Sequence, residues 1–231
     1  MSSPTSQDID TALTLPDSEA LTRFRGWANA GIAEAQLVLG QMLLDGRGCQ
    51  PAPVAAFGWF LKAARTGHPM AMNMVGRCYE NGWGVAGDQE TAASWFRGAA
   101  LKGLDWGMYN YATALALGRG CVEDRQAAFD WLTRAVALGH AKSMNVLGGF
   151  YEDGWTVAKN PRQARMLYAQ AAQGGDFRGW FNLARFQIAE GRTDDARRSL
   201  QMASRTATPD FKASMEQYLE GVGFVPEADL Q

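Results

Sequence analysis

A unit of 36 residues recurs in register along the chain, and this period restricts the possible folds more than any other feature. A small residue occupies one phase of the unit, at Gly40, Gly76, Ala112 and Gly148. Glycines occupy a second phase, at Gly46, Gly82, Gly118 and Gly154. A fixed period of this size is typical of stacked repeats rather than of a closed globule.

Residues 70–103 show what one unit contains. Apolar residues follow helical spacing over 71–79 and again over 92–100, as expected for two amphipathic helices. Gly82-Trp83-Gly84 separates them, and glycine adopts the backbone angles that a helix end requires. A glycine inside a helix costs about 1 kcal/mol relative to alanine. Its recurrence at the phase of Gly76 predicts that a neighbouring helix approaches the backbone there.

These features resemble the Sel-one-like repeat (SLR), an α/α relative of the tetratricopeptide repeat. The resemblance is carried by the Leu39-Gly40 pair, the Gly-x-Gly turn, and a Trp-Phe pair followed by paired alanines and a glycine. It extends from about Leu21 to Met202. It implies an all-α fold, a right-handed α/α solenoid of about four to five helix-turn-helix repeats with helical caps. The family shares an architecture rather than a chemistry.

The repeat phase predicts a single solenoid over residues 17–220. Residues 1–16 are polar and lack periodicity, so we expect a disordered tail there, with Asp17 or Ser18 capping the first helix. The remaining expected segments are an N-terminal cap at 17–31, repeats at about 33–67, 69–103, 105–139 and 141–175, a degenerate repeat at 177–204, a capping helix at 210–220 and a C-terminal tail at 221–231.

Composition limits the partners and the compartment. The net charge of −2 predicts no general attraction to nucleic acid or to an anionic membrane. No apolar run is long enough for membrane insertion, and the first residues lack the basic and apolar regions of a secretory signal. Many bacterial relatives in the resembled family are exported, and this sequence departs from them. An odd number of cysteines, three, favours free thiols and a cytoplasmic protein.

The residues that usually carry chemistry are too far apart in the repeat order. His68 and His140 lie two repeats apart, so we expect each to bond nearby backbone rather than to share a metal ion. Cys49 and Cys121 are separated in the same way, and Cys78 falls on an apolar helix face. The Gly-x-Gly turns follow helices rather than strands, so they are not dinucleotide fingerprints. We therefore expect no catalytic residue, no cofactor and no metal.

Trp-Phe pairs recur in the second helix of successive units, at Trp59-Phe60 and Trp95-Phe96, with the related Trp131 in the next unit. These aromatic residues could form a ligand-binding box. Their strict period and helical spacing favour the repeat core instead.

The inner surface of the predicted solenoid is the main candidate site. Solenoids present an extended concave face, and in the resembled family the first helix of each repeat lines it. Amides can pair with both groups of a peptide backbone, arginine favours carboxylates, and aromatic residues dominate interface hot spots. A solvated helix face is the alternative interpretation. The candidate partner-binding residues on this concave groove are Asn73, Arg77, Trp106, Tyr109, Asn110, Lys142, Asn145, Arg178, Phe181, Asn182 and Arg185.

A second candidate surface is the turn edge. It consists of Arg47, Trp83, Arg119 and Trp155, in alternation along the repeats. Side by side, arginine could stack on indole. The alternative is local packing of the turns.

The function predicted from these features is protein–protein interaction, by an adaptor or scaffold that holds a peptide or helix of a partner protein in its groove. The alternative is a dedicated regulatory or accessory subunit of one partner enzyme. A weak resemblance to short SLR proteins encoded beside iron-dependent hydroxylases and iron-uptake receptors points to that alternative. Charge reversal at Arg77 and Arg185 is expected to weaken partner binding and to leave folding nearly intact.

Overall fold

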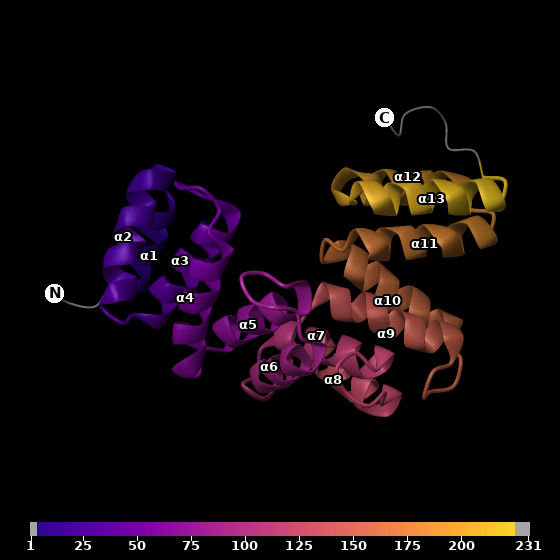
Figure 1. Ribbon diagram of the computed structural model, residues 1–231. Helices are drawn as coiled ribbons and strands as arrows, with labels where there is room; N and C mark the ends of the chain where they lie inside the picture. Colours follow the sequence, from indigo (N-terminus) through magenta and orange to yellow (C-terminus); the bar gives the residue numbers. More distant parts are fainter. Residues whose placement is uncertain (1–3, 225–231) are drawn as a thin grey trace. The chain divides into compact units, whose positions relative to one another are not determined.

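The computed structural model describes residues 4–224, which form thirteen α-helices and no strand within that range (Figure 1). The chain divides into two compact units, residues 1–124 (unit 1) and residues 125–231 (unit 2). Unit 1 contains α1 (Ser6–Leu13), α2 (Asp17–Asn29), α3 (Ala33–Asp45), α4 (Pro53–Arg65), α5 (Pro69–Asn81), α6 (Gln89–Leu101) and α7 (Asp105–Leu117). Unit 2 contains α8 (Arg125–Ala137), α9 (Ala141–Asp153), α10 (Pro161–Gln173), α11 (Phe177–Ala189), α12 (Thr193–Thr206) and α13 (Pro209–Gly221).

Caps and turn residues set the helix ends. Asp88 precedes α6, and its Oδ1 accepts hydrogen bonds from the backbone N–H groups of Glu90 and Thr91 at 3.0 and 3.2 Å. Such a cap satisfies N–H groups that have no partner within the helix. Gly82 ends α5 in the left-handed conformation, with φ at 72°. Local sequence therefore fixes where each helix of a repeat begins and ends.

The core of each repeat forms where a ring of the second helix lies on the glycine of the first helix. A Cβ atom on Gly76 would lie 2.6 Å from Cδ1 of Phe96, and one on Gly148 would lie 2.6 Å from Cε1 of Tyr168. Both are closer than real Cβ contacts, so only glycine fits. The close approach predicted from the mid-helix glycines is confirmed. The neighbour is a side-chain ring of the same repeat.

The prediction that the Trp-Phe pairs belong to the repeat core is confirmed for Phe60 and Phe96, and Trp59 and Trp95 pack against that core. Phe60 and Phe96 are buried, whereas Trp59, Trp95 and Trp131 are only half-buried. A helix advances about 100° per residue, so Phe60 and Phe96 face Gly40 and Gly76, and the indoles of Trp59 and Trp95 lie at the edge of the core. Lys62 makes a cation–π contact with one of these indoles, and its Nζ lies 3.8 Å from the ring centroid of Trp59.

Within each unit the helices stack in chain order. In unit 1, each helix from α1 to α6 packs on the next helix of the chain, and α5 also packs on α7. In unit 2, each helix from α8 to α11 packs on the next helix, and α9 also packs on α11. Met215 and Leu219 of α13 belong to one buried cluster with Ala184 of α11 and Leu200 of α12. The first helices α5 and α7, and likewise α9 and α11, therefore touch across successive repeats, as stacked repeats require.

The expected disordered tail at 1–16 is corrected by the structure. Residues 6–13 form α1, and Thr5 and Asp8 make reciprocal hydrogen bonds in a capping box. Ala12 is buried in the unit 1 core, so tertiary packing stabilises a helix too short to show a period. The expected cap at Asp17 or Ser18 was also wrong, because Pro16 occupies the N-cap position and Asp17 is the first residue of α2.

The C-terminal expectations agree with the helices. The degenerate repeat at 177–204 corresponds to α11 and α12, and the capping helix at 210–220 corresponds to α13. Of the predicted C-terminal tail at 221–231, residues 225–231 lie outside the described part of the chain.

Candidate interaction groove

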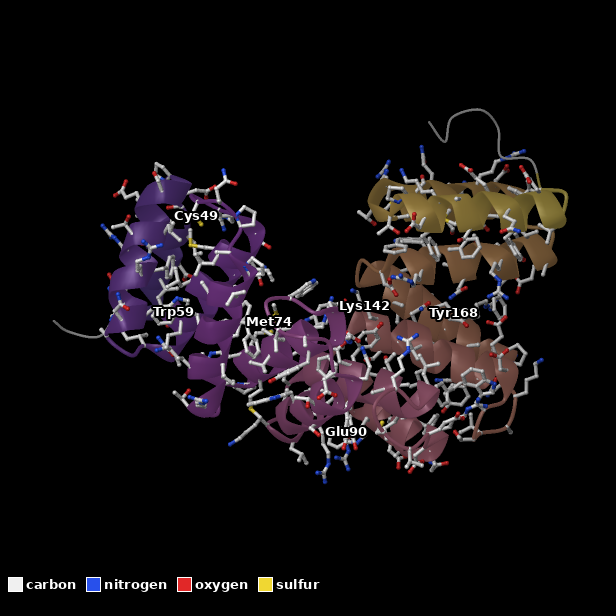
Figure 2. The ribbon with its side chains drawn as sticks, in the orientation of Figure 1. Cys49, Trp59, Met74, Glu90, Lys142 and Tyr168 are labelled. Carbon is white, nitrogen blue, oxygen red and sulfur yellow. The ribbon has the colours of Figure 1, made fainter. Side chains whose placement is uncertain are left out.

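A groove of about 750 Å³ opens on the first helices of unit 1. Met74 on α5, labelled in Figure 2, is one of the residues that line it. The size falls within the range of sites that bury small ligands or short segments, roughly 300–1,000 Å³. The lining residues are Gln41, Leu44 and Asp45 of α3, Pro51 and Pro53 beside the turn, Met70, Asn73, Met74 and Arg77 of α5, Trp83 of the turn and Trp106 of α7.

Two tryptophans belong to the lining of the groove. Trp106 lies in the first turn of α7, and the ring of Tyr109 packs against it edge-on with centroids 6.3 Å apart. Trp83 lies in the Gly-x-Gly turn after α5. Of the predicted concave residues, the structure places Asn73, Arg77 and Trp106 in one lining.

Arg77 is the cationic side chain in this lining. Its Cζ lies 5.3 Å from the ring centroid of Trp83, and its Nε lies 3.2 Å from Oε2 of Glu80. The side chains of Arg77 and Glu80 are 36% and 33% exposed. Ion pairs between residues three apart on one helix contribute about 0.2–0.5 kcal/mol to stability, so a ligand carboxylate can compete with Glu80 for the partly exposed guanidinium.

The predicted asparagines pair with one another. In unit 1, Nδ2 of Asn110 donates to Oδ1 of Asn73 at 2.8 Å, with 9% and 4% of the two residues exposed. In unit 2, Nδ2 of Asn182 donates to Oδ1 of Asn145 at 2.8 Å. Each pair joins the first helices of successive repeats. Both amides of the unit 1 pair are largely buried in the stack, and Asn73 also lines the groove.

In unit 2, predicted binding residues form hydrogen bonds and an ion pair with other residues of the same unit. The Nη2 atom of Arg185 donates to Oε1 of Glu152 at 2.9 Å, and its Nη1 atom donates to Oδ1 of Asn182 at 3.0 Å. The hydroxyl of Tyr168, labelled in Figure 2, donates to Oε2 of Glu152 at 2.6 Å. Burial, together with this carboxylate, raises the pKa of Tyr168. The charge of Arg185 is therefore paired with Glu152 inside unit 2, and reversing that charge would disturb the fold.

The aromatic anchor expected at Phe181 is also covered. Its ring packs edge-on against Phe211 and Tyr218 of α13, with centroids 5.5 and 5.4 Å apart. The exposed Arg178 lies over the rings of Phe177 and Phe211, at 4.4 and 5.3 Å. The capping helix thus occupies the surface that a ligand would need at α11.

A buried carboxylate lies at the start of α11. Asp176 is 5% exposed, and its Oδ1 accepts a hydrogen bond from the backbone N–H of Arg178 at 3.3 Å. Burial raises the pKa of Asp176, while that hydrogen bond and the charges of Arg178 and Lys142 act in the opposite direction. Lys142, labelled in Figure 2, therefore interacts electrostatically with a residue of its own unit.

The turn-edge residues are distributed among different contacts. Arg47 binds Oδ1 of Asp17 at 2.8 Å, and Arg119 is exposed. Trp155 stacks instead with Arg125, whose Cζ lies 4.5 Å from the ring centroid. Arginine–indole stacking is thus present, but the arginines come from helices.

Four residues of the groove lining were not predicted from the sequence, namely Asp45, Pro51, Pro53 and Met70. They lie at repeat junctions rather than on one repeated phase.

Both histidines bond to backbone, as predicted. The Nδ1 atom of His68 accepts from the N–H of Ala71 at 3.3 Å, and that of His140 accepts from the N–H of Ser143 at 3.2 Å. Each therefore caps the helix that follows it. Cys78 is buried, which raises its pKa to about 11 and keeps the thiol protonated at neutral pH.

The repeats match a known family model. The Sel1 repeat matches residues 33–68, 69–104, 107–140 and 141–176, which together make up more than half of the chain. The chain belongs to the Sel1 repeat family. Sel1 repeat proteins are generally scaffolds for protein–protein interaction, and their fold is typically non-catalytic. The solenoid fold class expected from the period is thereby confirmed.

Solved structures give the same fold. A Sel1 repeat protein from Oxalobacter formigenes is 27% identical, with a TM-score of 0.81 over 98% of this chain and 95% of that one. An immunity protein from Pseudomonas aeruginosa is 20% identical, with a TM-score of 0.56 over 82% of this chain and 80% of that one. No match was found among curated proteins. Within residues 4–224, none of the helices has the length and apolar character needed to cross a membrane.

Proposed function

We propose that the chain is a protein-interaction scaffold that holds a peptide or helix of a partner protein in the unit 1 groove. The observation that carries this proposal is the groove itself. It combines an apolar lining, rich in tryptophan and methionine, with the accessible guanidinium of Arg77. Sites that bind other molecules are typically concave and apolar with a few placed polar groups. The cytoplasm is the proposed compartment, because all three cysteines are free thiols.

The first part of the proposal concerns location. In unit 2 the corresponding surface is occupied by internal contacts of Arg185 and Phe181. In unit 1 the lining side chains enclose about 750 Å³ of open space. We therefore assign partner binding to unit 1 and a structural role to the equivalent residues of unit 2.

The second part concerns mechanism. A scaffold needs no bond-making chemistry, and its affinity comes from burying apolar anchors and from directed polar contacts. Met70 and Met74 can adjust their shape to different side chains. Arg77, held against Trp83, can bind a carboxylate or a backbone carbonyl.

The test is affinity capture from the native cell followed by mass spectrometry, with matched variants. Trp106→Ala and Arg77→Glu remove an apolar contact and a charge from the groove, and Arg119→Glu changes an exposed residue outside it. We expect the two groove variants to lose the same partner that the wild-type chain and the Arg119 variant retain. If the Arg119 variant alone loses the partner, the turn edge is the binding surface and the groove proposal is wrong.

A further inference from the structure

The unit 1 groove carries two opposite charges on neighbouring repeats. Asp45 is the last residue of α3, and Arg77 lies on α5 one turn before that helix ends. Both line the groove. The two charged groups therefore belong to the first helices of neighbouring repeats, near the ends of those helices.

Each charge is oriented by a neighbour that leaves it available. The Nε2 atom of Gln41 donates to both carboxylate oxygens of Asp45, at 2.8 and 2.9 Å, and an amide does not neutralise the carboxylate. Arg77 forms an ion pair with the half-buried Glu80 of its own helix and is stacked near Trp83. Such pairs are weak, so a ligand carboxylate can replace Glu80.

The rise per residue favours an extended chain over a helix as the occupant of the groove. A helix rises 1.5 Å per residue, whereas an extended chain advances about 3.3 Å per residue. An extended segment therefore reaches from one charge of the groove to the other with fewer residues than a helix needs.

From these observations, we infer that the groove takes an extended peptide segment with one basic and one acidic residue a few positions apart. This inference rests on the proposed function and specifies its ligand. The basic group of the peptide binds Asp45, the acidic group binds Arg77, and the apolar residues between them bury against Met74 and Trp106. Two opposite charges on the scaffold also fix the direction in which the peptide lies.

The probe for this inference is a random twelve-residue peptide library displayed on phage and selected against the full chain. We expect the enriched sequences to share a basic and an acidic residue two to four positions apart, separated by apolar residues. The affinities of one enriched peptide and of its neutralised versions are then measured by fluorescence anisotropy. The scaffolds compared are the wild-type chain, Arg77→Gln, Asp45→Asn and, as the matched control, Arg119→Gln.

Neutralising the acidic residue of the peptide should weaken binding to the wild-type and Arg119 scaffolds at least fivefold and leave binding to Arg77→Gln unchanged. Neutralising the basic residue of the peptide should weaken binding to the wild-type and Arg119 scaffolds to a similar extent and leave binding to Asp45→Asn unchanged. Enriched peptides without the charge pair, or an equal loss on every scaffold, would overturn this inference and leave the peptide-binding function intact. If no peptide is enriched, the proposed peptide-binding function itself is wrong.

Discussion

The Nδ2 atom of Asn110 donates a hydrogen bond to Oδ1 of Asn73 across 2.8 Å, and both side chains are buried between successive repeats. Asparagine is a poor helix former, and here its amide is used to join one first helix to the next. Asn182 and Asn145 repeat the contact in unit 2. The residues that sequence analysis assigned to ligand binding therefore help to hold the scaffold together.

Replacing one member of the buried pair should destabilise unit 1. In Asn110→Leu, the buried Oδ1 of Asn73 loses its donor, which costs about 1–3 kcal/mol. Urea unfolding should show that Asn73→Leu/Asn110→Leu loses less than the sum of the two single variants, because neither polar group is then left unpaired. Strictly additive losses would show that the two amides are not coupled.

The ring beneath the mid-helix glycine should carry more stability than the neighbouring indole. Phe96→Ala is expected to lower the free energy of unfolding by about 3–5 kcal/mol, and Trp95→Ala by less, because Trp95 is only half-buried. Gly76→Ala should also destabilise, since the new Cβ would meet the Phe96 ring. The control is Gly58→Ala in α4, where a Cβ meets nothing within 4 Å. That variant should gain about 0.5–1 kcal/mol, and a loss there would contradict the packing argument.

Thr156 is a strained substitute for a turn glycine. It stands 36 residues after Gly120 and adopts a φ of 61°, in the left-handed region that β-branched residues avoid. Thr156→Gly should raise the stability of unit 2 by about 1 kcal/mol, as measured by thermal unfolding. In Gly120→Ala, by contrast, the Cβ would lie 1.9 Å from the carbonyl oxygen of Gln89, and unit 1 should lose stability. An unchanged or lower melting temperature for Thr156→Gly would show that the strain is absent.

Asp176 should make the stability of unit 2 depend on pH. Burial raises its pKa in the folded protein, so the folded state holds the proton more tightly than the unfolded chain does. The stability that this group contributes is therefore complete below the ordinary carboxyl pKa and is lost as pH rises through the raised value. Asp176→Asn keeps an acceptor for the N–H of Arg178, and its advantage over the wild-type chain should grow as the pH rises above the ordinary carboxyl pKa.

Asp88→Asn is the matched control for that experiment. The side-chain hydrogen bond from Thr91 is the main cause that lowers the pKa of Asp88, so its contribution is present above the ordinary carboxyl pKa and is lost as pH falls. The two asparagine variants should therefore show opposite slopes when stability is measured against pH. Parallel slopes would mean that burial does not govern Asp176.

Arg185 should act as a structural residue. Arg185→Gln removes its charge-assisted bond to Glu152, and a loss of about 1–2 kcal/mol is expected in thermal unfolding. Arg178→Gln, at an exposed position of the same helix, should change stability much less. If partner binding falls in Arg185→Gln while its melting temperature equals that of the wild-type chain, Arg185 belongs to the binding surface after all.

Much of the fold follows from the sequence because the repeat encodes it locally. The period gives the number of repeats, turn glycines such as Gly82 end the first helices, and capping residues such as Asp88 begin the second. The glycine at position 76 also indicates a close contact, because a small residue recurs at this phase of the repeat where a neighbouring ring approaches the helix. These features depend on residues near one another in the chain, so pattern analysis reaches them.

The candidate site followed from the sequence only in part. Helical spacing places Asn73 and Arg77 on the same side of α5, and both line the groove, yet the amide of Asn73 is bound by Asn110 and largely buried. In the same way, the sequence predicts Arg185 as a binding residue, but in the structure it bonds Glu152 of α9 and lies near the ring of Tyr218 of α13. The sequence by itself therefore determined the repeat architecture and the chemistry of its first helices. Only the tertiary structure decided which of those side chains remain open to a partner, because burial and charge pairing depend on neighbours about 36 residues away.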